Sequence, residues 1–146
     1  MNKSIAAALV SLMALPALAQ MSPVGLWKTI DDKDGSAKSE IRIIETAGVF
    51  TGKIEKILDP KAKPGELCVE CTDDRKGQPM LGLEIIRGVR QVGGQAVWEG
   101  GTIVEPSTGK IYKMKMTPIE GGAKLEMRGF IGFSLLGRTQ TWLRVQ

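Results

Sequence analysis

The chain has 146 residues, a formal net charge of +4 and no histidine. Its lysines and arginines are scattered among nearly as many acidic residues, so we expect no nucleic-acid-binding surface. The absence of histidine excludes Ser-His-Asp and Cys-His catalytic sites and removes the commonest metal ligand.

The N-terminal segment has the pattern of a secretory signal peptide. Lys3 precedes an uncharged stretch that runs to Leu18, and the small residues Ala17 and Ala19 stand just before Gln20. We therefore expect cleavage after Ala19, a periplasmic or secreted location, and one domain over residues 20–146 with no stable membrane span. An uncleaved anchor is the alternative, but Pro16 interrupts the apolar stretch, which is shorter than the roughly 20 residues of a spanning helix.

From residue 24 onward the pattern is that of β-strands. Apolar residues alternate with polar ones, or form short blocks rich in Ile and Val that stop at Gly, Pro or Asp. The predicted strands cover residues 24–30, 39–46, 49–58, 81–92, 95–104, 110–118, 124–133 and 137–145.

These strands predict an all-β fold. Short turns separate the last four, which indicates an antiparallel meander, and residues 20–146 show no ten-residue stretch of helical period. Closing a sheet into a barrel removes both of its exposed edges. We therefore expect a single antiparallel meander closed into a β-barrel of about eight strands, in preference to a sandwich.

The only two cysteines, Cys68 and Cys71, form a C-x-x-C pair in a Pro- and Gly-bounded loop at residues 59–79. Redox catalysis needs a lowered thiol pKa, which the acidic neighbours disfavour. A zinc site needs four good ligands, and one chain offers two sulfurs and only carboxylates besides. A disulfide formed in an oxidising compartment is the third alternative and the one we favour. The acidic neighbours are Glu66, Glu70, Asp73 and Asp74.

Carboxylate pairs are the remaining route to acid–base catalysis. The adjacent pairs at residues 31–32 and 73–74 lie in turn-like segments, where neighbouring side chains diverge and stay solvated. We therefore expect no catalytic residue, no metal and no cofactor, and a protein that is not an enzyme.

One predicted strand carries a candidate ligand-binding stripe. Tyr112, Met114 and Met116 share a face of the strand at residues 110–118, opposite Lys113 and Lys115. Inside a barrel this stripe is suited to line an adaptable apolar pocket. The alternative is that it simply fills the barrel core.

Two segments at the chain ends resemble the lipocalin and fatty-acid-binding superfamily. The first strand carries the G-x-W motif of Gly25 and Trp27, and the last carries GRTQTWLR. The resemblance implies a lipocalin-like barrel whose end is closed by Trp27 packed under an arginine of the last strand, for which we expect Arg138. Such a cation–π contact is worth about 0.5 to 2 kcal/mol.

The alternation of side chains on the last strand does not decide which of its two faces points into the barrel. Arg138, Gln140, Trp142 and Arg144 share one face, and Leu143 and Val145 lie on the other. The closure by Arg138 favours the first face as the interior. Arginines there, with Arg128 as a further candidate, would need carboxylates or an anionic ligand, which suggests a fatty-acid-like molecule with an acidic head.

A longer resemblance covers nearly all of residues 20–146. The blocks SPVGLWKTIDDKDG, the C-x-x-C pair, PMLGLEIIRG and RGFIGFSLLGRTQTW resemble the bacterial envelope family catalogued as domain of unknown function 2147. The resemblance implies a secreted or periplasmic lipocalin-like barrel and no established reaction. We therefore expect a binding protein for a small hydrophobic or amphipathic ligand, with a filled barrel that acts as an envelope protein–protein interaction module as the alternative; the sequence identifies no protein partner.

Overall fold

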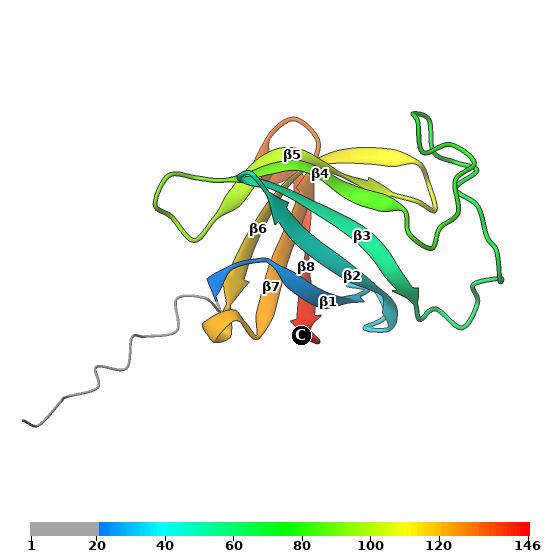
Figure 1. The fold of residues 1–146 in the computed structure, drawn as a ribbon, viewed down its shortest axis with the longest axis horizontal. Coiled ribbons are helices and arrows are strands. Elements are labelled where there is room, and N and C mark those ends of the chain that lie inside the picture. Colours follow the sequence, from blue (N-terminus) through cyan, green and yellow to red (C-terminus); the bar gives the residue numbers. More distant parts are fainter. Residues whose placement is uncertain (1–20) are drawn as a thin grey trace, which may run out of the picture.

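The computed structural model describes residues 21–146, so the predicted signal peptide lies outside the described residues. The described chain forms eight antiparallel strands, all of which the sequence predicted, and two short 3-10 turns (Figure 1). The strands are β1 (Gly25–Ile30), β2 (Ala37–Thr46), β3 (Val49–Ile57), β4 (Glu84–Gln91), β5 (Trp98–Glu105), β6 (Lys110–Ile119), β7 (Lys124–Phe130) and β8 (Gly137–Arg144). The 3-10 turns are η2 (Glu120–Gly122) and η3 (Ser134–Leu136).

The sheet is a closed barrel. Each strand pairs with its neighbour in the chain, and β1 pairs with β8 through Trp27 opposite Arg144 and Lys28 opposite Leu143. Closure satisfies the backbone groups that two free edges would expose. The predicted all-β barrel is therefore confirmed, and the sandwich alternative is not the fold.

One face of every strand supplies the core. Most inward side chains are apolar and alternate with mostly polar outward ones, the arrangement that the sequence pattern indicated. Burying each such side chain stabilises the fold by about 1.5–3 kcal/mol. The strand residues of the hydrophobic core cluster are Trp27, Ile41, Ile43, Phe50, Ile54, Ile85, Ile86, Val89, Trp98, Val104, Met114, Met116, Leu125, Met127 and Trp142.

Three strands begin or end three residues inside the bounds that the apolar pattern suggested. β5 begins at Trp98 rather than at residue 95. β4 begins at Glu84 rather than at residue 81, because Gly82 adopts a positive φ of 87° and its N–H donates to the carbonyl of Ile54. β7 ends at Phe130 rather than at residue 133, because the chain turns at Gly132, whose φ is 76°. The apolar residues beyond Phe130 therefore lie on a loop and not in the sheet.

None of the helical segments in residues 21–146 has the length and apolar character that a membrane crossing requires.

Candidate functional site

A cavity of about 620 Å³ lies at one end of the barrel. It lies where β1, β3 and β5 end and β8 begins. The connections after β3 and β5, which are on the right of Figure 1, contribute to its lining. Its size is within the range of about 300–1,000 Å³ that is usual for small-molecule sites.

The cavity has an apolar interior. Trp142 is buried, and its indole N–H donates to the Gln140 side-chain oxygen at 3.1 Å, which satisfies its only polar group. The other large apolar lining residues carry no charge and, except for Met80, come from strands spread around the barrel. The large apolar lining side chains are Ile54, Ile57, Met80, Ile85, Ile103, Tyr112, Met127 and Trp142.

The charged lining residues have both signs. Lys38 forms an ion pair with Asp59 at 3.5 Å, and Lys61 also contributes to the lining. More carboxylates than cations line the cavity, so its rim is not basic. The charged lining residues are Asp31, Lys38, Asp59, Lys61, Glu66, Glu105 and Arg138.

Arg138 is occupied by a carboxylate of the chain itself. Its Nε lies 2.9 Å from Oδ1 of Asp32, which also accepts a hydrogen bond of 3.1 Å from Gln140. Partial burial favours the protonated form of Asp32, but the hydrogen bonds and the Arg138 charge together hold its pKa below the usual value. Asp32 is therefore ionised near neutral pH and already neutralises the guanidinium that was expected to bind an acidic head.

The predicted ligand-binding residues fall into three groups. Tyr112, Arg138 and Trp142 line the cavity. Met114 and Met116 are fully buried and are not in the lining, so they fill the core, as the alternative interpretation of this stripe held. Arg128 is outside the lining, where it donates to the Ser134 carbonyl at 2.6 Å and the Thr139 hydroxyl at 2.7 Å.

The orientation of β8 is settled by burial. Trp142 is 2% exposed, whereas Leu143 and Val145 are 39% and 43% exposed. The face that carries Arg138, Gln140 and Trp142 is therefore the interior one. Arg138 and Gln140 are at the cavity end of this face, and Arg144 is at its other end.

The opposite end of the barrel is closed by Trp27 and Arg144. The Arg144 guanidinium carbon lies 4.2 Å from the centre of the Trp27 ring, and the Trp27 N–H donates to the Pro23 carbonyl at 2.8 Å. Gly25 belongs to the same closure, because a Cβ there would overlap the Gln146 carbonyl oxygen and the Arg144 side chain. The barrel is therefore closed by a first-strand tryptophan packed under a last-strand arginine, which is the kind of closure that the sequence predicted.

The sequence predicted that Arg138 closes the barrel. This prediction is wrong, because the closing residue is Arg144. β8 pairs antiparallel with β1 so that Arg144 is opposite Trp27. Arg138, six residues earlier, is consequently at the other end of the strand. The last strand has an arginine at each end of one face, and the sequence alone does not say which one the register brings to Trp27.

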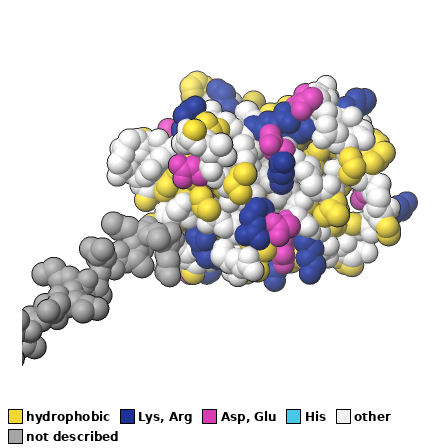
Figure 2. All heavy atoms as spheres, viewed as in Figure 1, with side chains coloured by type: hydrophobic (Ala, Val, Ile, Leu, Met, Phe, Trp, Pro, Cys, Tyr) yellow, Lys and Arg dark blue, Asp and Glu magenta, His cyan; other side chains and the backbone are white. Residues whose placement is uncertain are grey.

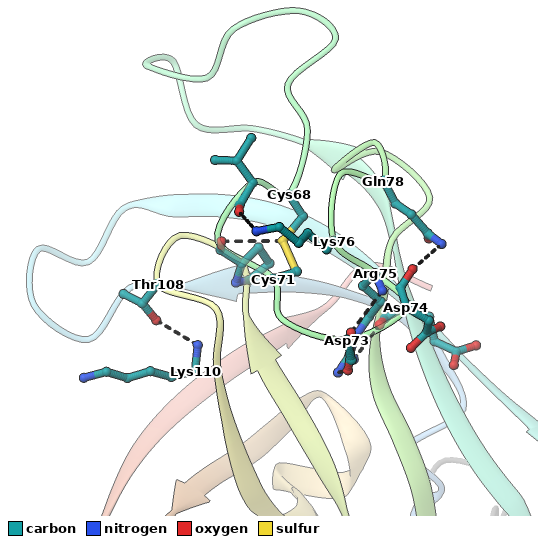
Figure 3. The surroundings of a disulfide bond; sticks show 12 residues. Cys68, Cys71, Asp73, Asp74, Arg75, Lys76, Gln78, Thr108 and Lys110 are labelled. Atoms are coloured by element: carbon teal, nitrogen blue, oxygen red, sulfur yellow. Dashed lines mark hydrogen bonds and ion pairs between the residues drawn. A yellow bond between two sulfur atoms is a disulfide. The ribbon is translucent and has the colours of Figure 1, made fainter.

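The C-x-x-C pair is a disulfide, as favoured. Cys68 and Cys71 are bonded and buried, at the point where the loop of residues 58–83 packs on the β5–β6 turn (Figure 3). Cys68 Sγ lies 3.7 Å from the Pro106 carbonyl oxygen, and Gly109 leaves space for the carbonyl of Glu70. The buried disulfide therefore stabilises the conformation of this loop next to the cavity.

A buried arginine anchors the other half of this loop. Arg75 is 2% exposed, forms an ion pair of 2.6 Å with Asp73, and donates to the Glu84 carbonyl on β4 at 3.0 Å. Hydrogen bonds from the Arg75 side chain and backbone lower the pKa of Asp73 to about 2. The loop that carries Glu66 and Met80 to the cavity is thus fixed at two points.

Several lining residues were not singled out from the sequence. Ile54, Ile85, Ile103 and Met127 are ordinary strand residues whose pattern marks them as interior but not as lining a void. Met80 belongs to the block PMLG, whose place over the barrel end depends on the disulfide loop. Within residues 21–146 no group of three or more Cys, Asp or Glu side chains is arranged to hold a metal ion.

The surface has no large region of one charge on the side shown in Figure 2. Basic and acidic side chains are interleaved, with apolar groups between them. This distribution agrees with the small net charge and offers no continuous basic track for nucleic acid on that face.

Comparison with known proteins identifies the family. The model of the uncharacterized proteins conserved in bacteria known as DUF2147 matches residues 25–144, which span the entire barrel. The chain belongs to this family. No curated protein matches the chain.

A solved structure shares the fold of this DUF2147 protein. It is the protein HP1028 from Helicobacter pylori, described as belonging to the lipocalin family, with 18% sequence identity and a TM-score of 0.71. The similarity covers 84% of this chain and 82% of the other. The DUF2147 barrel is therefore lipocalin-like, as the G-x-W motif and its position implied.

Proposed function

We propose that this DUF2147 protein binds a small hydrophobic or amphipathic molecule in the cavity at the open end of its barrel. The observation that carries the proposal is a cavity of about 620 Å³ with an apolar floor and a polar rim. Such sites use apolar walls for affinity and a few polar groups for orientation. The lipocalin-like fold supports the same function.

The polar end of the ligand is uncharged in this proposal. A carboxylate head would meet more carboxylates than cations at the rim, and would compete with Asp32 for Arg138. A hydroxyl, ester or amide can accept from Gln140 or Tyr112 and avoids that repulsion. This replaces the acidic head expected from the arginines of the sequence.

We further propose that the protein acts after export, with its signal peptide removed after Ala19, and that it binds and does not catalyse. The disulfide supports export, because such bonds persist in oxidising compartments. A chain without histidine lacks the usual general base near neutral pH, which supports binding over catalysis.

Native mass spectrometry of protein purified without detergent or reducing agent tests this function. We expect an adduct that denaturation releases, and we expect the substitution Ile103→Trp, which fills the cavity, to abolish it. Ile44→Trp is the matched control, because Ile44 is 46% exposed on the outside. An adduct carried equally by both variants would place the ligand elsewhere and contradict the proposal.

A further inference from the structure

The loop between β7 and β8 exposes an unusual set of apolar side chains. Ile131, Phe133, Leu135 and Leu136 are 64%, 77%, 89% and 74% exposed. They follow one another within six residues, and their loop stands at the top of Figure 1, clear of the barrel wall. We call these four residues the apolar tip.

The fold presents the tip outward in a defined way. Gly132 turns the chain with a φ of 76°, and η3 directs Leu135 and Leu136 away from the barrel. The Leu136 N–H donates to the Phe133 carbonyl at 3.0 Å, and Arg128 donates to the Ser134 carbonyl at 2.6 Å. These bonds hold the loop while its apolar groups remain in water, which costs free energy unless a partner covers them.

The barrel wall next to the tip is cationic. Lys113 on β6 is opposite Phe130, and Lys115 is opposite Arg128 on β7. Among the described residues none of these three cations forms an ion pair with a carboxylate. The acidic residues of this wall are Glu126, which is opposite Thr117, and Glu99, which is opposite Lys115.

We propose that the apolar tip, with Lys113, Lys115 and Arg128, docks the protein on an anionic lipid bilayer. Two interactions bind a protein to the surface of a bilayer. Apolar side chains enter the boundary between the headgroups and the acyl chains, and cationic side chains attract anionic headgroups. A stable protein partner needs roughly 800 Å² on each side, more than a convex six-residue loop offers. The inference rests on these exposed residues and is independent of ligand binding in the cavity.

Vesicle co-sedimentation tests the proposal on the chain from residue 20, with its disulfide intact. We expect the protein to pellet with vesicles of phosphatidylglycerol and phosphatidylcholine in equal parts, and to stay in solution with phosphatidylcholine alone. Raising the salt from about 0.1 to 1 M should release it, because screening removes the attraction of the three cations.

Two substitutions locate the contact. Leu135→Asp should weaken binding to the anionic vesicles at least about tenfold, because it removes one inserted side chain and adds a repelled charge. Val69→Asp is the matched control, since Val69 is 62% exposed on the disulfide loop, and we expect its binding to remain within about twofold of the unsubstituted protein. Both sites are exposed, so neither change should disturb folding.

Three outcomes would overturn the proposal. One is a protein that pellets with neither type of vesicle. Another is equal weakening by Leu135→Asp and Val69→Asp, which would mean that the tip is not the contact. The third is a concentration-dependent dimer in sedimentation equilibrium that Leu135→Asp abolishes, which would make a second copy the partner of the tip.

Discussion

The guanidinium of Arg144 lies over the ring of Trp27, 4.2 Å from its centre, and closes one end of the barrel. The same guanidinium donates to the carbonyl oxygens of Ser22, Val24 and Gly122. One side chain therefore joins the segment before β1, the turn before β7 and the last strand. Within residues 21–146, no arginine packs over a tryptophan ring at the other end of the barrel, where the cavity lies.

Truncating the ring should strongly destabilise the barrel. Trp27 is fully buried, so we expect Trp27→Ala to lower the free energy of unfolding by about 3 to 5 kcal/mol. Urea unfolding followed by circular dichroism measures the change. A loss below about 1 kcal/mol would contradict the burial of this ring.

The two arginines of β8 should differ in their effect on stability. Arg144→Met removes the cation–π contact and the hydrogen bonds that the guanidinium donates to backbone carbonyl groups, which should cost about 3 kcal/mol. Arg138→Met breaks only a partly exposed ion pair and should cost less than about 1 kcal/mol. Equal losses in the same unfolding experiment would mean that Arg144 does not close the barrel.

Much of this fold could be predicted from the sequence, because all eight strands are marked by alternation and by turn residues. The closure was also predictable in kind, since G-x-W on the first strand and an arginine on the last are local patterns. The choice of Arg144 over Arg138 depends on strand register, which alternation specifies only as odd or even. Tyr112, Arg138 and Trp142 of the cavity were predicted, but most of its lining was not, because an interior residue such as Ile103 has the same pattern whether it meets another side chain or a void.

The turn at Gly109 should tolerate no side chain. Its φ is 73°, and a Cβ there would overlap the Glu70 carbonyl oxygen of the disulfide loop. We expect Gly109→Ala to cost about 1 kcal/mol for the backbone conformation and about 1–3 kcal/mol more for the overlap. Gly65→Ala is the matched control, because Gly65 has a φ of 72° and open space around it, so only the first cost applies. Thermal unfolding of both variants should separate the two contributions.

Reduction of the disulfide should destabilise the protein moderately. The bond between Cys68 and Cys71 closes a very short loop, so chain-entropy reasoning gives a loss of about 2 kcal/mol for Cys68→Ser with Cys71→Ser. The segment at residues 58–83 should also become more sensitive to limited proteolysis, while the strands stay protected. Unchanged cleavage of this segment would show that Arg75 alone is sufficient to hold the loop.

The pair of Asp73 and Arg75 should contribute to acid sensitivity. The pKa of Asp73 falls from the usual 3.8 to about 2 in the folded protein, so its stabilising effect is complete above pH 4 and is lost as the pH falls towards 2. Asp73→Asn should lower stability at pH 7, because Arg75 stays buried without its charge partner. Between pH 4 and pH 2 the variant should lose less stability than the unsubstituted protein. Parallel curves of unfolding midpoint against pH would contradict this assignment.

The most direct test of the proposed binding function is a fluorescence titration with 1-aminoanthracene, an uncharged apolar probe, followed by displacement. We predict a saturable rise in fluorescence with one site per chain, displacement by dodecan-1-ol at least as effective as by dodecanoic acid, and no rise with Ile103→Trp. Ile44→Trp should bind the probe as the unsubstituted protein does. No saturable binding, or binding that Ile103→Trp leaves unchanged, would contradict a ligand site in the barrel.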